Sequence, residues 1–427
     1  MLLVAIVFTI LMVIGMPVAF AVGISGVAFF LQNPELPRTM TVQLTVTETQ
    51  NFALLAVPLF ILAGNFLNSS GIAHNLLKLA SVLTGRLQGG LAQVSIALST
   101  LMSGVTGSSI ADAAMNTRLL GFEMLKRGFS KGYAAGVLSY GSLMAPIIPP
   151  GIGFILYGTV GQVSIGRLFA AGIIPGFMLW AALAVTISIT ARRRGYKPEL
   201  DRAPTPSEIA KASIAGIWAI LFPIILIIGL RFGVFTPSEI GAFAVVYAFL
   251  VGVFAYRMLT WTSFKQAVEA SLIDVGAVMF LLALSAVFGY GIIFERIPEV
   301  ISTWMLGITD DPNIVMVIIV LFILIAGTFM EGSVLIVMLT PIFMPLLEQY
   351  NIDPVHFGLV FIIAATIGNY TPPVGGAMFV VCQILRCPIE DYTRESIPFL
   401  IAVSLVTLLL IFMPGIVLYV PNLLFNP

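Results

Sequence analysis

Long stretches without a charged side chain dominate this sequence. Of its 427 residues, 59% are hydrophobic and 9% are charged, whereas a soluble domain carries about 25% charged residues. The windows that contain no Asp, Glu, Lys or Arg are 1–34, 49–77, 87–111, 132–166, 168–191, 212–230, 240–256, 275–294, 312–330, 332–347, 354–385 and 397–427. Most of them can cross a bilayer, because a membrane helix needs roughly 20 apolar residues. We therefore expect an all-α polytopic membrane protein in contact with lipid.

The residues that build metal centres and nucleotide sites are scarce. Cys382 and Cys387 lie in apolar surroundings and provide neither a disulfide framework nor a four-ligand metal site. His74 and His356 are too few and too far apart for a zinc cluster. No glycine-rich Walker sequence ends in Lys-Ser or Lys-Thr, so we do not expect ATP-driven transport by this chain. We also expect no organic cofactor and no nucleic-acid partner.

Basic residues indicate which side of a membrane each loop faces. They are densest between residues 192 and 211, and we assign that loop to the cytoplasm. We then treat 87–125 and 312–350 as hairpins that return to the side from which they enter. This arrangement places the N-terminus inside and the C-terminus outside. The basic residues left on the outer side are Arg38, Arg167, Arg231 and Arg296.

Two parts of the chain carry the same order of features. The first contains LMSGVTGSSIADAAMNTRLL at 101–120, followed by SYGSLMAPIIPPGIGF at 139–154. The second contains IAGTFMEGSVLIVMLTPIF at 325–343, followed by AATIGNYTPPVGGAMF at 364–379. An offset of about 224 residues relates the copies and maps the first helix onto one that runs in the opposite direction. Repeats of inverted topology are a common architecture of secondary transporters.

The repeat suggests a division of the chain into two related halves and a connecting helix. We expect two re-entrant helical hairpins and two broken helices, one of each in every half. The expected parts are a first repeat at 1–205 with a hairpin at about 87–125 and a broken helix at about 131–166, a connecting helix at 206–236, and a second repeat at 237–427 with a hairpin at about 312–350 and a broken helix at about 354–386.

Breaks in the backbone mark candidate sites, because an unpaired N–H or C=O group in hydrocarbon costs several kcal/mol. Proline has no N–H and frees the carbonyl groups that precede it, and these oxygens can hold sodium. We predict two related sodium sites, one from the first hairpin tip with 141–150 and one from the second tip with 366–372. The alternative is that these prolines only kink helices for packing.

Polar side chains near the tips are candidate residues for solute binding or gating, since a charge within the membrane is costly. Glu331 lies at the second tip, and Asp112 and Arg118 follow the first. The latter two form either a salt bridge within the hairpin or part of the site. Helix N-termini at the hairpin ends favour a carboxylate. Further hydrogen bonds can come from Asn116, Asn369, Tyr370 and Thr371.

With these motifs the chain resembles the large membrane subunit of a TRAP transporter, the tripartite ATP-independent periplasmic class. The resemblance covers essentially the whole chain and rests on GVTGSSIADA at 104–113, GYAAGVLSYGSLMAPIIPPG at 132–151, and MEGS and GNYTPPVGG in the second half. It implies an elevator-type transporter in the bacterial inner membrane. It also implies sodium-coupled import of a small anionic solute of the sialic acid or C4-dicarboxylate class. The implied partners are a small four-helix membrane subunit and a soluble periplasmic substrate-binding protein.

The same resemblance assigns the two sodium sites to particular residues by motif. The residues that would frame the first site are Ser103, Gly104, Ser108, Ser109, Gly141 and Pro149. Those that would frame the second are Gly327, Met330, Gly332, Ser333, Thr366, Gly368 and Thr371.

Three other hypotheses compete with this one. A sodium–dicarboxylate symporter of similar fold would transport without a binding protein. A channel would also need broken backbone at the midplane, but channels usually assemble symmetric pores from several subunits. A membrane hydrolase could use Ser108 or Ser109 as nucleophile, but neither histidine lies in a window that also offers a catalytic carboxylate. We therefore expect a transporter and not an enzyme.

Overall fold

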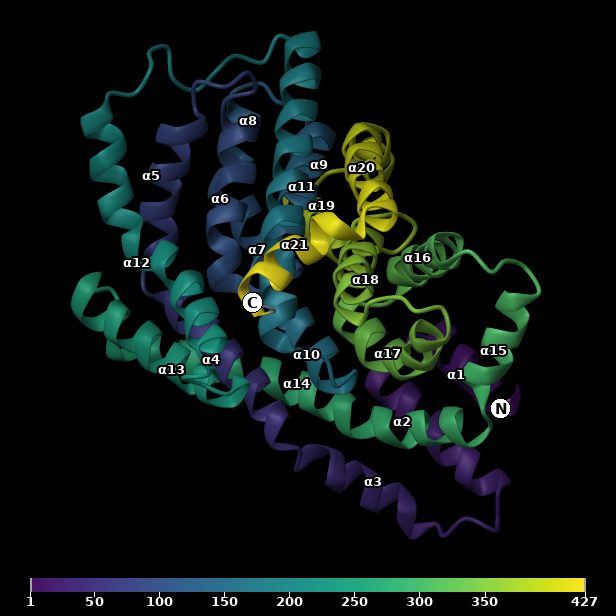
Figure 1. Ribbon diagram of the computed structural model, residues 1–427. Helices are drawn as coiled ribbons and strands as arrows, with labels where there is room; N and C mark the ends of the chain where they lie inside the picture. The colour runs from purple at the N-terminus through teal and green to yellow at the C-terminus, as the bar shows by residue number, and fades with distance from the viewer. Residues whose placement is uncertain (1, 426–427) are drawn as a thin grey trace.

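The computed structural model describes residues 2–425, and every regular element within them is a helix (Figure 1). The elements of the first half are α1 (Leu2–Val13), α2 (Val18–Gln32), α3 (Thr39–Thr49), η1 (Phe52–Leu55), α4 (Ala56–Ser69), α5 (Ile72–Thr84), α6 (Leu91–Thr106), α7 (Ser109–Asn116), η2 (Thr117–Gly121), α8 (Phe122–Lys126), α9 (Lys131–Gly141), η3 (Ser142–Met144), α10 (Ile152–Val160) and α11 (Ile165–Arg194). Those of the second half are α12 (Pro206–Arg231), α13 (Pro237–Leu250), η4 (Val251–Ala255), α14 (Trp261–Phe294), α15 (Ile297–Leu306), α16 (Pro312–Phe329), α17 (Gly332–Gln349), α18 (Pro354–Asn369), α19 (Gly376–Leu385), α20 (Ile389–Phe412) and α21 (Pro414–Phe425).

Helices long and apolar enough to cross a membrane make up much of this structure. Between residues 2 and 425 there are eight of them. Two begin at a complete capping box, in which Thr205 and Thr236 accept the backbone N–H of Glu208 and Glu239 while each glutamate side chain accepts the threonine N–H. A proline follows each threonine at the first helical position. These local signals start α12 and α13 at defined residues.

The two predicted hairpins and two broken helices are present. In the first hairpin α6 and α7 meet at Gly107, which has a φ of +58°, and in the second α16 and α17 meet at Met330 and Glu331. The short helix η3 and residues 145–151 separate α9 from α10, and residues 370–375 separate α18 from α19. The prolines and glycines of each break prevent a continuous helix, as the sequence predicts.

The second repeat runs in the opposite direction to the first. The start of α9 lies beside the end of α19, where Lys131 Nζ donates to the Arg386 carbonyl at 3.2 Å. The end of α10 lies beside the start of α18, where Tyr157 Oη donates to the Pro354 carbonyl at 2.9 Å. The two broken helices are therefore antiparallel, which confirms the inverted topology.

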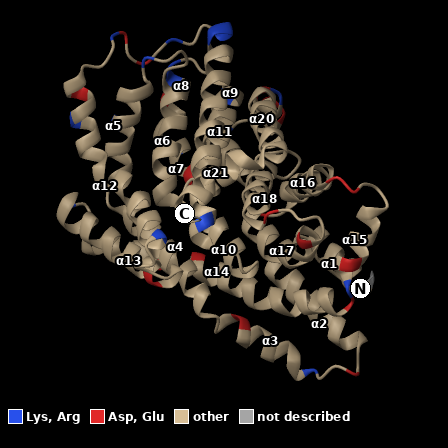
Figure 2. Cartoon of the chain, in the orientation of Figure 1, with Lys and Arg blue, Asp and Glu red and all other residues tan. Residues whose placement is uncertain are grey.

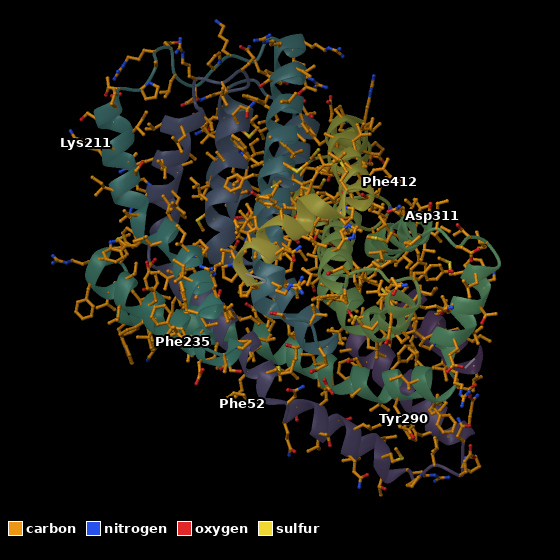
Figure 3. The ribbon with its side chains drawn as sticks, viewed as in Figure 1. Phe52, Lys211, Phe235, Tyr290, Asp311 and Phe412 are labelled. Carbon is orange, nitrogen blue, oxygen red and sulfur yellow. The ribbon has the colours of Figure 1, made fainter. Side chains whose placement is uncertain are left out.

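The hairpins also enter from opposite ends of the molecule. The first begins near the basic loop, where Gln88 Nε2 donates to the Tyr196 carbonyl at 2.8 Å. The second begins and ends near Thr309, whose carbonyl accepts a hydrogen bond from Tyr350 Oη at 3.1 Å. Figure 3 shows Lys211, next to the basic loop, and Asp311, at the start of the second hairpin, on opposite sides. The two tips consequently meet in the interior.

Long-range contacts sort the basic residues as the topology requires. At one end Arg127 pairs with Glu199 and Arg194 pairs with Glu395, and Figure 2 shows basic residues gathered there around the ends of α8, α9, α11 and α12. At the other end Arg231 Nε donates to the Leu424 carbonyl at 2.8 Å. The C-terminal helix thus lies beside an arginine predicted to be outside.

Packing divides the helices into two groups, which we call the frame and the block. In the frame, α4 packs against α13 and α14, and α14 also packs against α2 and α3. In the block, α16 packs against α18, α9 against α20, α10 against α17, and α11 against α20 and α21. Helix α5 packs between α12 and α6, and α15 lies at the edge of the molecule, where it contacts α14 and α17 (Figure 1). Each group takes helices from both halves, and the division at residues 205 and 237 stays a prediction.

Close packing of α11 on the first break gives a test of the fold. A Cβ at Gly172 would lie 2.1 Å from the Ile147 carbonyl oxygen, whereas one at Gly276 would meet nothing within 4 Å. Gly172→Ala should therefore lower the free energy of unfolding by about 1–3 kcal/mol, the usual cost of overpacking. The measurement is the thermal unfolding temperature in detergent, with Gly276→Ala as the control. Equal temperatures for both variants would contradict this packing.

Candidate functional site

A cavity of about 520 Å³ lies where both hairpin tips face the frame. Helices α4 and α14 supply its frame side, and the two tips, the first break and α18 supply its block side. This volume is within the range of about 300–1,000 Å³ that is usual for small-molecule sites. The polar residues that line it are Asn65, Asn68, Thr106, Ser108, Ser109, Asp274, Glu331, Ser333, Thr366 and Asn369.

The cavity separates the predicted site residues into two groups. Those that line it are Ser108, Ser109, Glu331, Gly332, Ser333, Thr366 and Asn369. Those that do not line it are Ser103, Gly104, Asp112, Asn116, Arg118, Gly141, Pro149, Gly327, Met330, Gly368, Tyr370 and Thr371. Most of the second group lies behind the tips, inside the block.

Glycines allow the first tip to approach the first break closely. A Cβ at Gly107 would lie 3.0 Å from the Pro150 carbonyl oxygen, and one at Gly104 would lie 3.6 Å from the Pro149 carbonyl oxygen. Ser103 Oγ donates to the Thr100 carbonyl within its own helix at 2.5 Å. Gly141 packs instead against Ile96 of α6. The structure thus brings Gly104 and Pro149 together but places Gly141 one helical turn away from the break.

The second tip meets the second break through an even closer backbone contact. A Cβ at Gly368 would lie only 2.6 Å from the Gly327 Cα. The N–H of Gly375 donates to the Thr328 carbonyl at 2.8 Å, which joins the two segments directly. The Thr366 and Thr371 hydroxyls donate to carbonyls of α18 at 2.6 and 2.8 Å, so their lone pairs stay available as acceptors. Gly327 and Gly368 therefore have a packing reason as well as a predicted role in the site.

Met330 lies at the second tip but points away from the cavity lining. Its side chain packs against a small apolar cluster formed by Val22, Leu281, Val334 and Met338. This cluster contains residues of both frame and block. Met330 therefore contributes apolar contact between the second tip and the frame.

Asp112 is completely buried behind the first tip. Its Oδ2 accepts hydrogen bonds from Ser99 Oγ at 2.5 Å and from Asn116 Nδ2 at 3.3 Å, and Asn116 Nδ2 also contacts Ser99 Oγ. Arg118 lies on the π-helix η2 with an exposed side chain. The proposed salt bridge between Asp112 and Arg118 is wrong, since the carboxylate hydrogen bonds with neutral groups and the arginine faces outward.

Tyr370 connects the two repeats behind the cavity. It belongs to the second break, yet its hydroxyl lies 3.1 Å from Ser142 Oγ at the first break, and it interacts with Ser109 of the first tip. Its carbonyl accepts a hydrogen bond from Tyr392 Oη at 2.8 Å. The neighbouring Asn369 accepts the Gly376 N–H through Oδ1 at 3.0 Å. The two breaks thus contact each other through buried groups.

Comparison with known proteins identifies the family. The model of the DctM component of the tripartite ATP-independent periplasmic transporters matches residues 5–416. The chain belongs to this family. It is 34% identical to the 2,3-diketo-L-gulonate TRAP transporter large permease protein YiaN of Escherichia coli (strain K12), over 95% of each chain. It is 33% identical to the sialic acid TRAP transporter large permease protein SiaM of Vibrio cholerae, over 96% of this chain and 95% of the relative.

A solved structure agrees with the fold of this DctM-family permease. The YdaH transporter of Alcanivorax borkumensis, whose crystal structure was described as having an unusual topology, superimposes with a TM-score of 0.65 at 15% sequence identity. The match covers 87% of each chain. The family confirms that the chain is an inner-membrane transport protein and not an enzyme. Ser108 and Ser109 are therefore part of a transporter tip and not nucleophiles of a hydrolase.

Four polar residues that line the cavity of the permease were missed by the sequence analysis. Thr106 is the last residue of α6, at the first tip. Asn65 and Asn68 lie on α4, and Asp274 lies on α14. Asp274 borders an uncharged window, which makes it resemble the edge of a loop, but α14 starts at Trp261 and places this carboxylate well inside a continuous helix. Asp274 could have been found from the sequence if the membrane helix had been allowed to begin before the uncharged window at 275–294. An acidic residue within a membrane helix is a candidate for a functional role.

The link through Tyr370 gives a second test. Tyr370→Phe removes the hydroxyl that meets Ser142 but leaves the backbone carbonyl that Tyr392 uses. Losing one such hydrogen bond should lower the free energy of unfolding by about 1 kcal/mol. The thermal unfolding temperature in detergent measures this, with Tyr419→Phe, which changes a 63% exposed tyrosine, as control. If both variants unfold at the wild-type temperature, this hydroxyl contact between the two breaks does not stabilise the permease.

Proposed function

We propose that the chain imports a carboxylate-bearing solute, that a periplasmic binding protein delivers this solute, and that sodium ions moving with it drive the import. The observation that carries the proposal is the cavity at which both hairpin tips meet the frame. A site formed by two inverted repeats suits alternating access, because each repeat can open toward a different side. The names of the relatives, which refer to 2,3-diketo-L-gulonate and sialic acid, support a carboxylate solute.

The oxygen atoms available at the two breaks support sodium as the coupling ion. Pro149 and Pro150 have no N–H to give to the carbonyls of Ala145 and Pro146, so these oxygens lack their helical hydrogen bonds. The second break has Pro373 in the corresponding position relative to the Asn369 carbonyl. Neutral carbonyl and hydroxyl oxygens suit a hard monovalent cation. Sodium in these places would neutralise part of the negative charge that an anionic solute brings.

The packing also supports an elevator movement as part of the proposal. The cavity is bounded by α4 and α14 on the frame side and by the tips on the block side. Both tips and both breaks belong to the block, where α16 packs on α18 and α19 packs on α7. A block that slides along the frame would carry solute and sodium together. The small membrane subunit would then stabilise the frame, whose outer helices carry many exposed apolar side chains.

The sodium sites are tested by removing one hydroxyl from each. Ser108→Ala and Thr366→Ala should each raise the sodium concentration needed for half-maximal uptake by about fivefold or more, since a hydrogen bond or ligand worth about 1 kcal/mol is lost. Thr407→Ala is the matched control, because its hydroxyl likewise donates to a carbonyl of its own helix, at 2.8 Å, but lies outside the cavity. Unchanged sodium dependence in both site variants would remove these residues from the sodium sites.

The tripartite function is tested by reconstitution. Proteoliposomes that hold the chain and its small membrane partner should take up labelled sialic acid or succinate only when the cognate binding protein and an inward sodium gradient are both present. Uptake by the membrane proteins alone would favour the binding-protein-independent symporter. Uptake that needs the binding protein but no sodium gradient would contradict the proposed coupling.

A further inference from the structure

The cavity contains two carboxylates and no basic side chain. Asp274 comes from α14 of the frame and Glu331 from the second hairpin tip, and none of the described residues that line the cavity is Lys, Arg or His. Both acidic side chains are exposed at the cavity, and Asp274 interacts electrostatically with Glu331. An anionic solute therefore meets acceptor oxygens and not a guanidinium or ammonium group.

The frame side of this cavity is built to hold polar groups. Asn65 Nδ2 donates to Ser271 Oγ at 2.9 Å and approaches Asp274 Oδ2 at 3.4 Å. This contact joins α4 to α14 and holds the Asp274 carboxylate in place. Asn68 lies three residues after Asn65 on the same face of α4 and also lines the cavity. The two amides and the two carboxylates supply both donors and acceptors for hydrogen bonds.

The two carboxylates of the cavity repel a solute with two negative charges more than a solute with one. A dicarboxylate such as succinate would bring two negative charges into a cavity that already holds two carboxylates, and succinate offers no hydrogen-bond donor to them. A monocarboxylate with several hydroxyl groups brings one charge and several O–H donors, each of which can be accepted by a carboxylate oxygen. Its single carboxylate can face the N-termini of α7 and α17 at the tips, where residues 109 and 332 line the cavity.

We propose that the solute of this permease is a polyhydroxylated monocarboxylate, and that Asp274, Asn68 and Glu331 bind its hydroxyl groups. Asn65 is a positioning residue that acts through Asp274. The inference rests on the proposed function, because it takes the cavity to be the solute site. It goes beyond that function by preferring a hydroxylated acid to a C4-dicarboxylate.

The test is direct binding to the purified permease together with its small membrane subunit, so that the binding protein does not impose its own selectivity. The probes are gluconate and succinate, added separately in sodium buffer, and the readout is ligand-dependent thermal stabilisation. For the wild type, the gluconate concentration that gives half-maximal stabilisation should be at least tenfold lower than the corresponding succinate concentration. Asp274→Asn should weaken the apparent affinity for gluconate about tenfold. It should also reduce the ratio between the succinate and gluconate concentrations that give the same stabilisation.

Glu269→Gln is the matched control, because it makes the same change of carboxylate to amide on α14 at an exposed position that does not line the cavity. It should bind gluconate as the wild type does. Preference of the wild type for succinate, absence of gluconate binding, or equal behaviour of the two variants would each overturn the proposal. Sodium-driven uptake of succinate with its binding protein would overturn it while leaving the proposed function intact.

Discussion

A helix that breaks inside hydrocarbon exposes N–H and C=O groups that water cannot satisfy, and the architecture of this permease depends on how those groups are covered. Each hairpin tip packs on the break of its own repeat. In the second repeat the backbones of Gly327 and Gly368 come so close that a methyl group at Gly368 would lie 2.6 Å from its neighbour, and the Gly375 N–H bonds to Thr328. Tip and break therefore form one unit, and the cavity lies where two such units face the frame.

This constraint explains why the site residues lie at different depths. Small and hydroxyl-bearing residues such as Ser108 and Thr366 reach the cavity, because the tips end there. Asp112 is further back, where Ser99 and Asn116 satisfy one of its oxygens. Tyr370 lies at the same depth and touches the first break from the second. The buried polar groups hold the tips together, and the exposed groups line the cavity.

The sequence was sufficient to predict the fold because its signals are local. Proline pairs and glycine–serine runs in the middle of apolar windows indicate breaks, and their recurrence at a constant offset indicates an inverted repeat. The lining of the cavity was only partly predictable. Its frame side comes from Asn65 and Asp274, which are 209 positions apart and meet only through the packing of α4 on α14. Arg118 was misplaced because a residue six positions from Asp112 does not share its helical face.

We propose that this cavity opens to one side of the membrane at a time. The most direct measurement is the labelling rate of a cysteine at Ala114, which lines the cavity but belongs to neither predicted sodium site, in a background where Cys382 and Cys387 are replaced by serine. A membrane-impermeant thiol reagent is applied from one side in the presence and absence of sodium. Sodium should change the labelling rate of this cysteine severalfold, and it should do so in opposite directions for the two sides of the membrane. Equal labelling from both sides, unaffected by sodium, would indicate an open pore and contradict this proposal.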